Sequence, residues 1–474
     1  MKKLTTSKFL LDNKSKLQEI IKNLETDFKY VSILGCDVDG ASYSVTTSAI
    51  SLNPSPDYQR GFVIRVYTDL GFSEYSFNEV NVDEVCENVR KIALEDRKKI
   101  VEGLDRVTYD RLPNDDEITK ERITEVENLP EQDNPEKIIT TLQKIHDEVK
   151  AKYEKIVQLS LRLNITQVNK IFLSKNKDLY QSYAYSTGFA MAAATDGKNT
   201  KLDFISSSGL CGSELISEFK KAADDACRRT EELLTADRVV PGEYDIICDP
   251  DFTGLIAHEA FGHGAEMDMY VKERAKGKEY QDKRVASDKI IMHDGATAFD
   301  EVSSYLFDDE GNLGRDTVII DKGILRHGMC DELSAILLGK ESTGNGKRES
   351  FKRKVYTRMT NTFFEAGEDS VEDMIKSVDK GYLLEGFSSG MEDPKNWGIQ
   401  CVAMKGREII DGKLTGKIVS PVYLTGYVPD LLQSITQVSN GLVLSGGGYC
   451  GKGWKEWVKT STGGSYIKAK GILS

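Results

Sequence analysis

Hydrophobic and polar residues alternate along two stretches in the first half of the chain. In VQLSLRLNITQV (157–168), positions 159, 161, 163 and 165 are leucine or isoleucine, and the residues between them are polar. This period of two predicts a half-solvated strand. GFVIRVYTD (61–69) alternates in the same way, and EYSFNEV follows after a short turn that contains glycine. The second pattern predicts a β-hairpin.

Other segments repeat their hydrophobic residues with the period of a helix. They predict amphipathic helices over 82–100, 135–155 and 213–236. The second helix has a strong start signal, because Asn134 can cap it and Pro135 fits its first turn. The segment from 110 to 137 is dense in charge and is broken by three prolines. We expect it to be a surface connection with short helical pieces.

The pattern of predicted secondary structure changes near residue 240. Pro241 and Gly242 interrupt it, a short strand follows, and beyond that point short strands alternate with glycine turns. The pattern predicts an α+β protein of two domains. We expect a mixed α/β N-terminal domain over 1–240 and a β-rich C-terminal domain over 241–474.

Composition narrows the class of protein. The chain has 474 residues and a net charge of -13. No basic stripe offsets this charge, so we expect neither a nucleic-acid partner nor a membrane surface. The sequence also lacks a signal-peptide core and any run of roughly 18 apolar residues. The eight cysteines stand singly, as is typical of reduced thiols. A cytoplasmic protein is expected.

The stretch LIAHEAFGHGAEMD (255–268) contains two of the five histidines. Asp249 and Pro250 form a cap and first turn, which predicts a helix that starts at Pro250. His258 and His263 are five positions apart, and on a regular helix such residues diverge by about 140°. Either a π-type turn or a helix that ends at Gly262 would bring them together.

Glu259, next to the first histidine, could act as a general base on a metal-bound water. A pair of ordinary histidines near a helix end remains the alternative. A third ligand must come from elsewhere, and His146, His293 and His327 stay open as candidates. Cys450 lies in the glycine-rich LSGGGYCGKGW, where a loop can approach a metal closely, although it could equally be a buried cysteine in a turn.

Four segments resemble the TldD/PmbA metallopeptidases, the modulator-of-DNA-gyrase family, in the order that the family has them. The segments are HEAFGHGAEMD, FDDEGNLGRDTVIIDKGIL, LLGKESTGNGKRESFKRKVYTRMTNTFFEAG and GGYCGKG. GFVIRVYTDLGFSEYS also resembles the family's N-terminal strand pair. The segment from 388 to 406 departs from the family's usual form, which leaves the substrate side of the site open.

The resemblance implies a site and an assembly. His258, His263 and Cys450 would be the metal ligands and Glu259 the base, as in the TldD-type, catalytically competent members. The ion would be divalent, zinc in the first place and iron as the alternative. The family fold is an α/β domain followed by a β-rich one. It is assembled as a dimer, here either a homodimer or a heterodimer with a PmbA-type chain, which lacks the site.

The sequence therefore predicts a metal-dependent peptidase that hydrolyses short or unfolded peptides, with exposed β-edges holding an extended substrate. Two alternatives remain: a catalytically inactive partner or recognition subunit, and a protein whose metal is structural. Glu266 and Asp268 could orient the histidines or face solvent. The polar segments 343–350 and 358–361 could line a substrate channel or serve the structure, and the structural interpretation is favoured.

Overall fold

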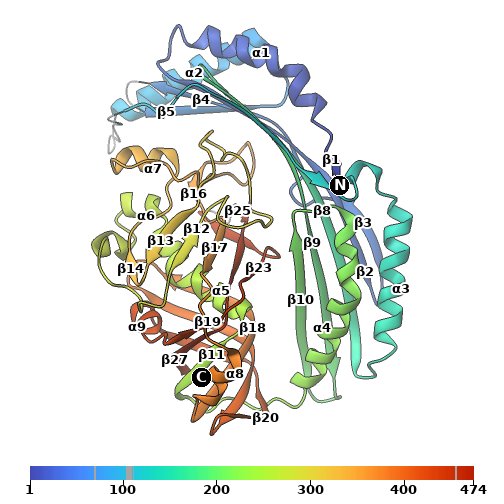
Figure 1. Ribbon diagram of the computed structural model, residues 1–474. Coiled ribbons are helices and arrows are strands. Elements are labelled where there is room, and N and C mark those ends of the chain that lie inside the picture. The colour runs from blue at the N-terminus through green and yellow to red at the C-terminus, as the bar shows by residue number, and fades with distance from the viewer. Residues whose placement is uncertain (69–70, 103–108, 110, 454–455) are drawn as a thin grey trace.

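An eight-stranded sheet forms the N-terminal half of the protein (Figure 1). The computed structural model describes residues 1–68, 71–102, 109, 111–453 and 456–474. The main strand order is β10-β9-β8-β2-β4-β5, with β3 beside β2 and β6 parallel to β9. The strands are β2 (Val31–Thr46), β3 (Ile50–Pro54), β4 (Gln59–Thr68), β5 (Gly71–Phe77), β6 (Ile118–Ile123), β8 (Ile156–Ser174), β9 (Lys177–Thr195) and β10 (Thr200–Gly209). The short strands β1 (Lys2–Lys3) and β7 (Glu125–Val126) pair with each other.

Both strands predicted from period-two patterns are present. The stretch 157–168 lies in β8, and 61–68 lies in β4, which forms a hairpin with β5. Asp69, the last residue of the second prediction, lies outside the described residues. Besides one 3-10 turn, Pro130–Gln132, the described part of the segment 110–137 contains two strands that were not predicted, β6 and the short β7. β6 lies at a sheet edge with largely exposed side chains, so its sequence resembles a surface connection.

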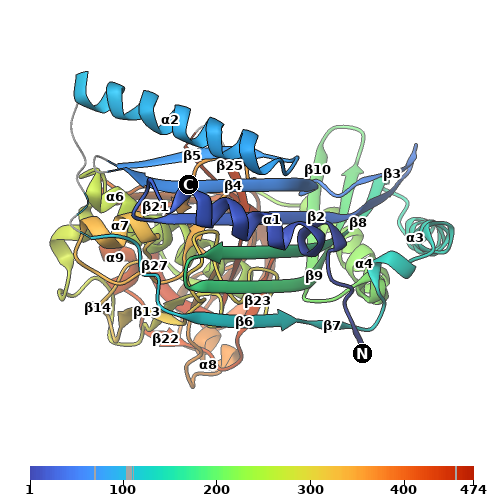
Figure 2. The same cartoon turned by 90° about the horizontal axis from the view of Figure 1, so that it is seen from above.

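Four helices cover the two ends of this sheet (Figures 1 and 2). They are α1 (Lys8–Leu24), α2 (Val82–Glu102), α3 (Pro135–Lys150) and α4 (Phe219–Leu233). Asn134 caps α3 as predicted, since its side chain accepts a hydrogen bond from the Lys137 amide. The third predicted helix begins later than expected, because Ser213–Glu218 form a 3-10 helix before α4. α1 and α2 pack on one face at the β4–β5 end, and Phe307 and Phe351 pack on the opposite face.

The C-terminal half contains two further sheets. The first has the order β11-β18-β19-β21-β27-β22 with β20 beside β19, and the second has the order β14-β13-β12-β17-β26-β23. The first comprises β11 (Gly242–Cys248), β18 (Lys380–Asp393), β19 (Gly398–Ile410), β20 (Lys413–Val419), β21 (Val422–Tyr427), β22 (Gln437–Val438) and β27 (Ile467–Leu473). The second comprises β12 (Met292–Asp294), β13 (Thr317–Asp321), β14 (Ile324–Leu325), β17 (Asn361–Phe364), β23 (Val443–Ser445) and β26 (Ser461–Gly464).

Short elements complete this half. Two small hairpins pair β15 (Gly346–Lys347) with β16 (Tyr356–Thr357), and β24 (Tyr449–Lys452) with β25 (Glu456–Lys459). The helices are α5 (Pro250–Ile256), α6 (Met267–Val271), α7 (Glu332–Leu337), α8 (Val371–Lys376) and α9 (Val428–Gln433), with a 3-10 helix at Lys276–Tyr280. The α+β class is confirmed.

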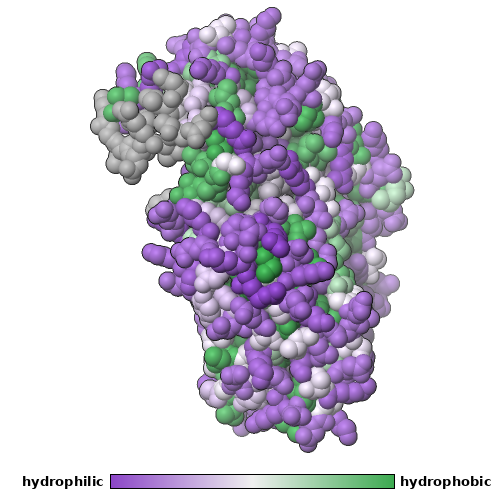
Figure 3. Space-filling model, turned by 60° about the vertical axis from the view of Figure 1, so that its left-hand side comes forward, coloured by the Kyte–Doolittle hydropathy of each residue, from purple (hydrophilic) through white to green (hydrophobic). Residues whose placement is uncertain are grey.

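The strands of the large sheets stay on either side of residue 240. This separation supports the boundary that we propose there. On the face shown in Figure 3, hydrophilic residues predominate and hydrophobic residues form small, separate groups. Among the described residues, no helix is long and apolar enough to cross a membrane.

The helix that carries the two histidines is buried between the C-terminal sheets. Phe252, Ile256 and Phe261 on it belong to the largest hydrophobic cluster, together with residues of both sheets. A Cβ atom on Gly254 would lie 2.7 Å from the backbone of Gly463 in β26. The helix and the sheet are therefore in backbone contact, and this contact fixes the position of the helix and of the residues that follow it.

Candidate metal centre

The helix that begins at Pro250 changes its hydrogen-bonding pattern where the histidines lie. Asp249 caps α5 by accepting a hydrogen bond from the Phe252 amide at 2.8 Å. α5 continues as a π-helix over Ala257–Gly262 and then as one 3-10 turn over His263–Ala265. Of the two local solutions that the sequence allowed, the structure therefore has the π-type turn. The wider turn returns the fifth residue to the face of the first.

The turn brings His258 and His263 together with Cys450 of β24. One potential ligand atom from each residue lies within 4.8 Å of the other two. Cys450 Sγ is 3.4 Å from His263 Nε2, and the imidazole ring centroids are 5.1 Å apart. Among the described residues, this is the one group of three or more such side chains that could hold an ion.

The other candidate histidines have different neighbours. His293 lies between two carboxylates, with Nδ1 2.6 Å from Asp316 and Nε2 2.8 Å from Glu365. His146 Nδ1 is 2.9 Å from the Asp147 carboxylate, and His327 is exposed. The structure thus brings together the three residues that the family resemblance implied.

The two histidines determine the charge of the Cys450 thiol. Burial raises the pKa of the Cys450 thiol, but His258 and His263 more than offset this and hold that pKa well below its usual value. Burial lowers the pKa of His263, whereas Cys450 and Glu266 raise it to a value well above normal. The thiol is therefore held as a thiolate, the form that binds metals.

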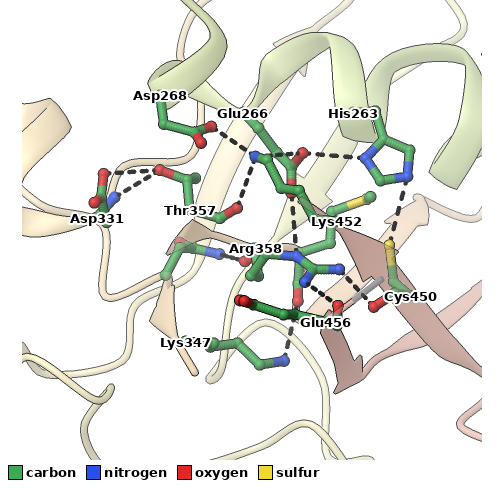
Figure 4. Close-up of polar contacts among 12 residues, drawn as sticks. His263, Glu266, Asp268, Asp331, Lys347, Thr357, Arg358, Cys450, Lys452 and Glu456 are labelled. Atoms are coloured by element: carbon green, nitrogen blue, oxygen red, sulfur yellow. Dashed lines mark hydrogen bonds and ion pairs between the residues drawn. The ribbon is translucent and has the colours of Figure 1, made fainter. Parts of the chain in front are cut away.

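A shell of charged residues fixes the orientation of this group (Figure 4). Glu266 Oε2 lies 3.1 Å from His263 Nδ1 and 3.0 Å from Lys452 Nζ. Burial raises the pKa of Glu266, but Lys452 and His263 outweigh it and hold that pKa below normal. Glu266 therefore fits the orienting role considered from the sequence. Asp268 contacts Lys452 at 2.6 Å instead of a histidine.

Arg358 holds the strand that carries Cys450. It is almost fully buried, and its Nη2 donates a hydrogen bond of 2.6 Å to the Cys450 carbonyl. Thr360 and Asn361 are also buried, and Asn345 donates to Asp294 and to the Arg358 carbonyl. These contacts support the structural interpretation of the segments 343–350 and 358–361.

The donor set suits a divalent cation. Nδ1 of His258 is buried and has no hydrogen-bond partner among the described residues. A buried polar atom without a partner is costly unless something binds it. Two imidazoles and a thiolate are ligands that zinc and ferrous iron both accept, and three protein ligands leave one position open. The residues present therefore fit a catalytic metal ion.

The strand β18 forms one wall beside this group. A Cβ on Gly390 would lie 2.6 Å from Glu259 Cγ, so the half-buried Glu259 packs directly against β18. Two residues further along the strand, Glu392 Oε1 lies 2.9 Å from where a Cβ of Gly264 would be. Both carboxylate oxygens of Glu392 are buried and lack a hydrogen-bond partner among the described residues. Glu392 was not predicted as a site residue, and its one signal in the sequence is its place in the segment 388–406, which departs from the family's usual form.

Glu392 should make the stability of the metal-free protein depend on pH. Burial raises the pKa of Glu392 well above its normal value, and Glu259 adds to the rise although His263 opposes it. Above the unfolded-state pKa of about 4.3, the unfolded chain releases a proton that the folded chain keeps. The free energy of unfolding therefore falls as pH rises from there toward the folded-state pKa.

Glu392→Gln removes this titration, so the variant should gain stability relative to the wild type as pH rises through that window. Urea unfolding followed by tryptophan fluorescence at a series of pH values measures the difference. Glu368→Gln, at an exposed position, is the control and should run parallel to the wild type. A Glu392→Gln curve that also ran parallel would show that Glu392 has the same pKa in both states.

Two imidazoles and a thiolate with a carboxylate beside them are a donor set that suits a catalytic metal ion. Residues 241–472 match the family model for the PmbA/TldA metallopeptidase C-terminal domain. A metalloprotease of Methanocaldococcus jannaschii is 28% identical over 322 residues, which are 68% of this chain and 70% of that protein. The zinc metalloprotease TldD homolog of Saccharolobus solfataricus is 26% identical over 432 residues, 83% of this chain and 95% of the relative.

The fold has solved relatives as well. The crystal structure of TldE from Thermococcus kodakarensis superposes with a TM-score of 0.75 at 18% identity, covering 97% of this chain and 99% of that one. The chain belongs to the TldD/PmbA family of metallopeptidases.

Proposed function

We propose that the protein is a TldD-type peptidase that hydrolyses short or unfolded peptides with a metal ion held by His258, His263 and Cys450. The observation that carries the proposal is that one potential ligand atom from each of these three side chains lies within 4.8 Å of the other two. Glu259 directly follows His258 in the sequence. Zinc is the first choice, in line with the name of the Saccharolobus relative, and iron is the alternative.

The ion, when bound, supplies a Lewis acid for the scissile carbonyl and lowers the pKa of a water. Glu259 accepts the proton of the attacking water and passes it to the leaving amine. Glu266 and Lys452 hold His263 in the required orientation, and Arg358 holds the backbone of Cys450. These residues keep the site rigid, so little reorganisation is needed during the reaction.

The substrate peptide binds along β18. β11 pairs with β18 over Gly381–Leu384, and β19 covers the opposite edge as far as Asp393. In the described part of the chain, no strand pairs with the outer edge of β18 beyond Leu384. Backbone pairing there would place an extended peptide beside Glu259 with little dependence on its sequence.

The inactive-partner alternative is less well supported, because the base and three ligands are all present. A purely structural ion would need a fourth protein ligand, and the group in the described residues has three. The likeness to TldE supports an assembly with a PmbA-type chain, and a homodimer is the other arrangement. We place the protein in the cytoplasm.

Removing the metal tests the proposal. Hydrolysis of an unstructured peptide by the purified protein should be abolished by a chelator, because the carbonyl and the water lose their activation. Addition of zinc should restore it, and ferrous iron under anaerobic conditions tests the alternative. Product formation is followed by mass spectrometry. Hydrolysis that persisted in protein shown to be metal-free would refute the metal-dependent mechanism.

A further inference from the structure

A groove lies on the side of the β24–β25 hairpin opposite the metal centre. In this hairpin Cys450 is paired with Val458, and Gly451 is paired with Trp457. Side chains alternate along a strand, so Tyr449 and Trp457 point away from the face that carries Cys450. Both residues line the groove, together with Tyr58 and Gln59 of the N-terminal half and with Glu349, Ser350, Lys352 and Arg353. Its volume is about 710 Å³.

A second hollow continues the groove. It shares Tyr58, Gln59, Ser350 and Lys352 with the first and extends to Arg60. Two large aromatic side chains are half exposed along the groove, Tyr58 at 55% and Trp457 at 50%. Half-exposed aromatic rings in a hollow offer contact area to an extended chain at low cost in conformational entropy.

Two basic residues, Lys352 and Arg353, line the groove together with two acidic ones, Asp57 and Glu349. The basic pair begins a run of three exposed basic residues, 352–354, in a chain whose net charge is -13. Lys352 has no carboxylate within ion-pair distance in the parts of the chain that the structure describes, whereas Arg353 Nε lies 3.4 Å from Glu349 Oε2. A local patch of this kind attracts anionic groups that the rest of the surface repels.

The acidic side chains of the groove already have internal partners. Asp57 accepts hydrogen bonds from the hydroxyls of Tyr185 and Tyr449. Glu349 Oε1 accepts one from the Trp457 amide at 3.0 Å, and Glu349 Oε2 pairs with Arg353. The floor is also fixed, because Gln59 accepts a hydrogen bond from the Phe351 amide at 2.9 Å. The groove is thus preformed, and Lys352 is the basic lining residue that has no internal ion pair among the described residues.

We propose that this groove is an exosite for an acidic, extended segment of a peptide substrate. The inference rests on the proposed peptidase function, which it makes more specific. Carboxylates of the segment pair with Lys352 and Arg353, and its apolar side chains pack on Trp457 and Tyr58. The scissile bond then lies across the hairpin, where Cys450 is located.

Binding can be measured without turnover. A fluorescein-labelled, unstructured acidic peptide is titrated with the Glu259→Gln protein, and fluorescence anisotropy gives its Kd. Lys352→Glu combined with Arg353→Glu should raise this Kd about tenfold at low salt, and the difference should shrink at high salt. Lys289→Glu combined with Lys413→Glu changes the net charge equally at exposed positions elsewhere and should leave the Kd unchanged.

A neutral peptide and an oligonucleotide test whether the groove is specific for an acidic peptide. Trp457→Ala should also weaken binding, and the same peptide with glutamine in place of glutamate should bind the unsubstituted groove about tenfold more weakly. Equal affinity for both peptides, or equal weakening in both double variants, would overturn the exosite. So would preferential binding of an oligonucleotide of the same charge.

Kinetic measurements on protein that retains Glu259 distinguish a failure of the exosite proposal from a failure of the peptidase proposal. In the Lys352→Glu, Arg353→Glu variant, KM for a long acidic peptide should rise while kcat is unchanged, and a short neutral peptide should keep both values. Unchanged KM for the long peptide would contradict the exosite. If the wild type cleaves no peptide, the peptidase proposal fails, and the binding measurements still decide whether the groove takes an acidic segment.

Discussion

Replacing Glu259 with glutamine is expected to lower kcat/KM for peptide hydrolysis by about 10²–10⁴-fold, the range typical of losing a general base. Glutamine keeps the size of the side chain, so packing against Gly390 of β18 is preserved. It cannot accept the proton of the attacking water. The proposed ligands are untouched, and metal content per chain, measured by elemental analysis, should therefore equal that of the wild type.

Glu243→Gln is a matched control for this change. Glu243 is an exposed glutamate on β11, and its substitution should leave kinetics and metal content unchanged. Wild-type turnover in metal-loaded Glu259→Gln protein would exclude Glu259 as the base. Loss of the metal together with activity would assign Glu259 to the support of the site instead of proton transfer.

Replacing Cys450 with serine is expected to remove most of the bound metal. A serine hydroxyl stays protonated near neutral pH and replaces the thiolate poorly. Losing a residue that only orients a ligand lowers metal affinity by up to about 100-fold, so losing a ligand should lower zinc affinity by at least that much. Ions that bind only the folded state stabilise it by about 2.7 kcal/mol at a hundredfold excess over Kd. This zinc-dependent gain should vanish in Cys450→Ser.

Metal analysis and thermal unfolding with and without zinc check this expectation. Cys211→Ser, in the N-terminal half and away from the histidines, should keep the zinc-dependent shift of the wild type. A Cys450→Ser protein with full metal content and a normal shift would show that the thiolate is not a ligand. Hydrolysis should be lost in parallel with the metal, because the three proposed ligands act as one unit.

The elements that follow from local patterns were predictable. The period of two in β8 and the cap at Asn134 depend on neighbouring residues, and the structure has both where the sequence placed them. β6 was missed because an edge strand buries little, so its hydrophobic pattern is weak. The 3-10 turn before α4 was missed because helical periodicity does not distinguish the first turns of a helix from a tighter one.

The candidate site was predictable only in part. The five-residue spacing of His258 and His263 showed that a regular helix would not serve, and it left two local solutions open. Packing decided between them. A Cβ on Gly262 would overlap Met359 Sδ, so the turn is pressed against a residue nearly a hundred positions away. The glycine-rich surroundings of Cys450 made it a candidate, and the resemblance to a family implied that it is a ligand.

The sequence by itself determined the helices and strands with strong periods, the helix caps and the acidic charge, and it supplied the candidate metal ligands. These properties depend on residues close together in the chain. Only the tertiary structure decided that the histidine turn is a π-helix, that Lys452 and Arg358 brace the site, and that Glu392 lies beside it. Those contacts join segments separated by tens to hundreds of residues. They form only when the two C-terminal sheets have packed around the helix.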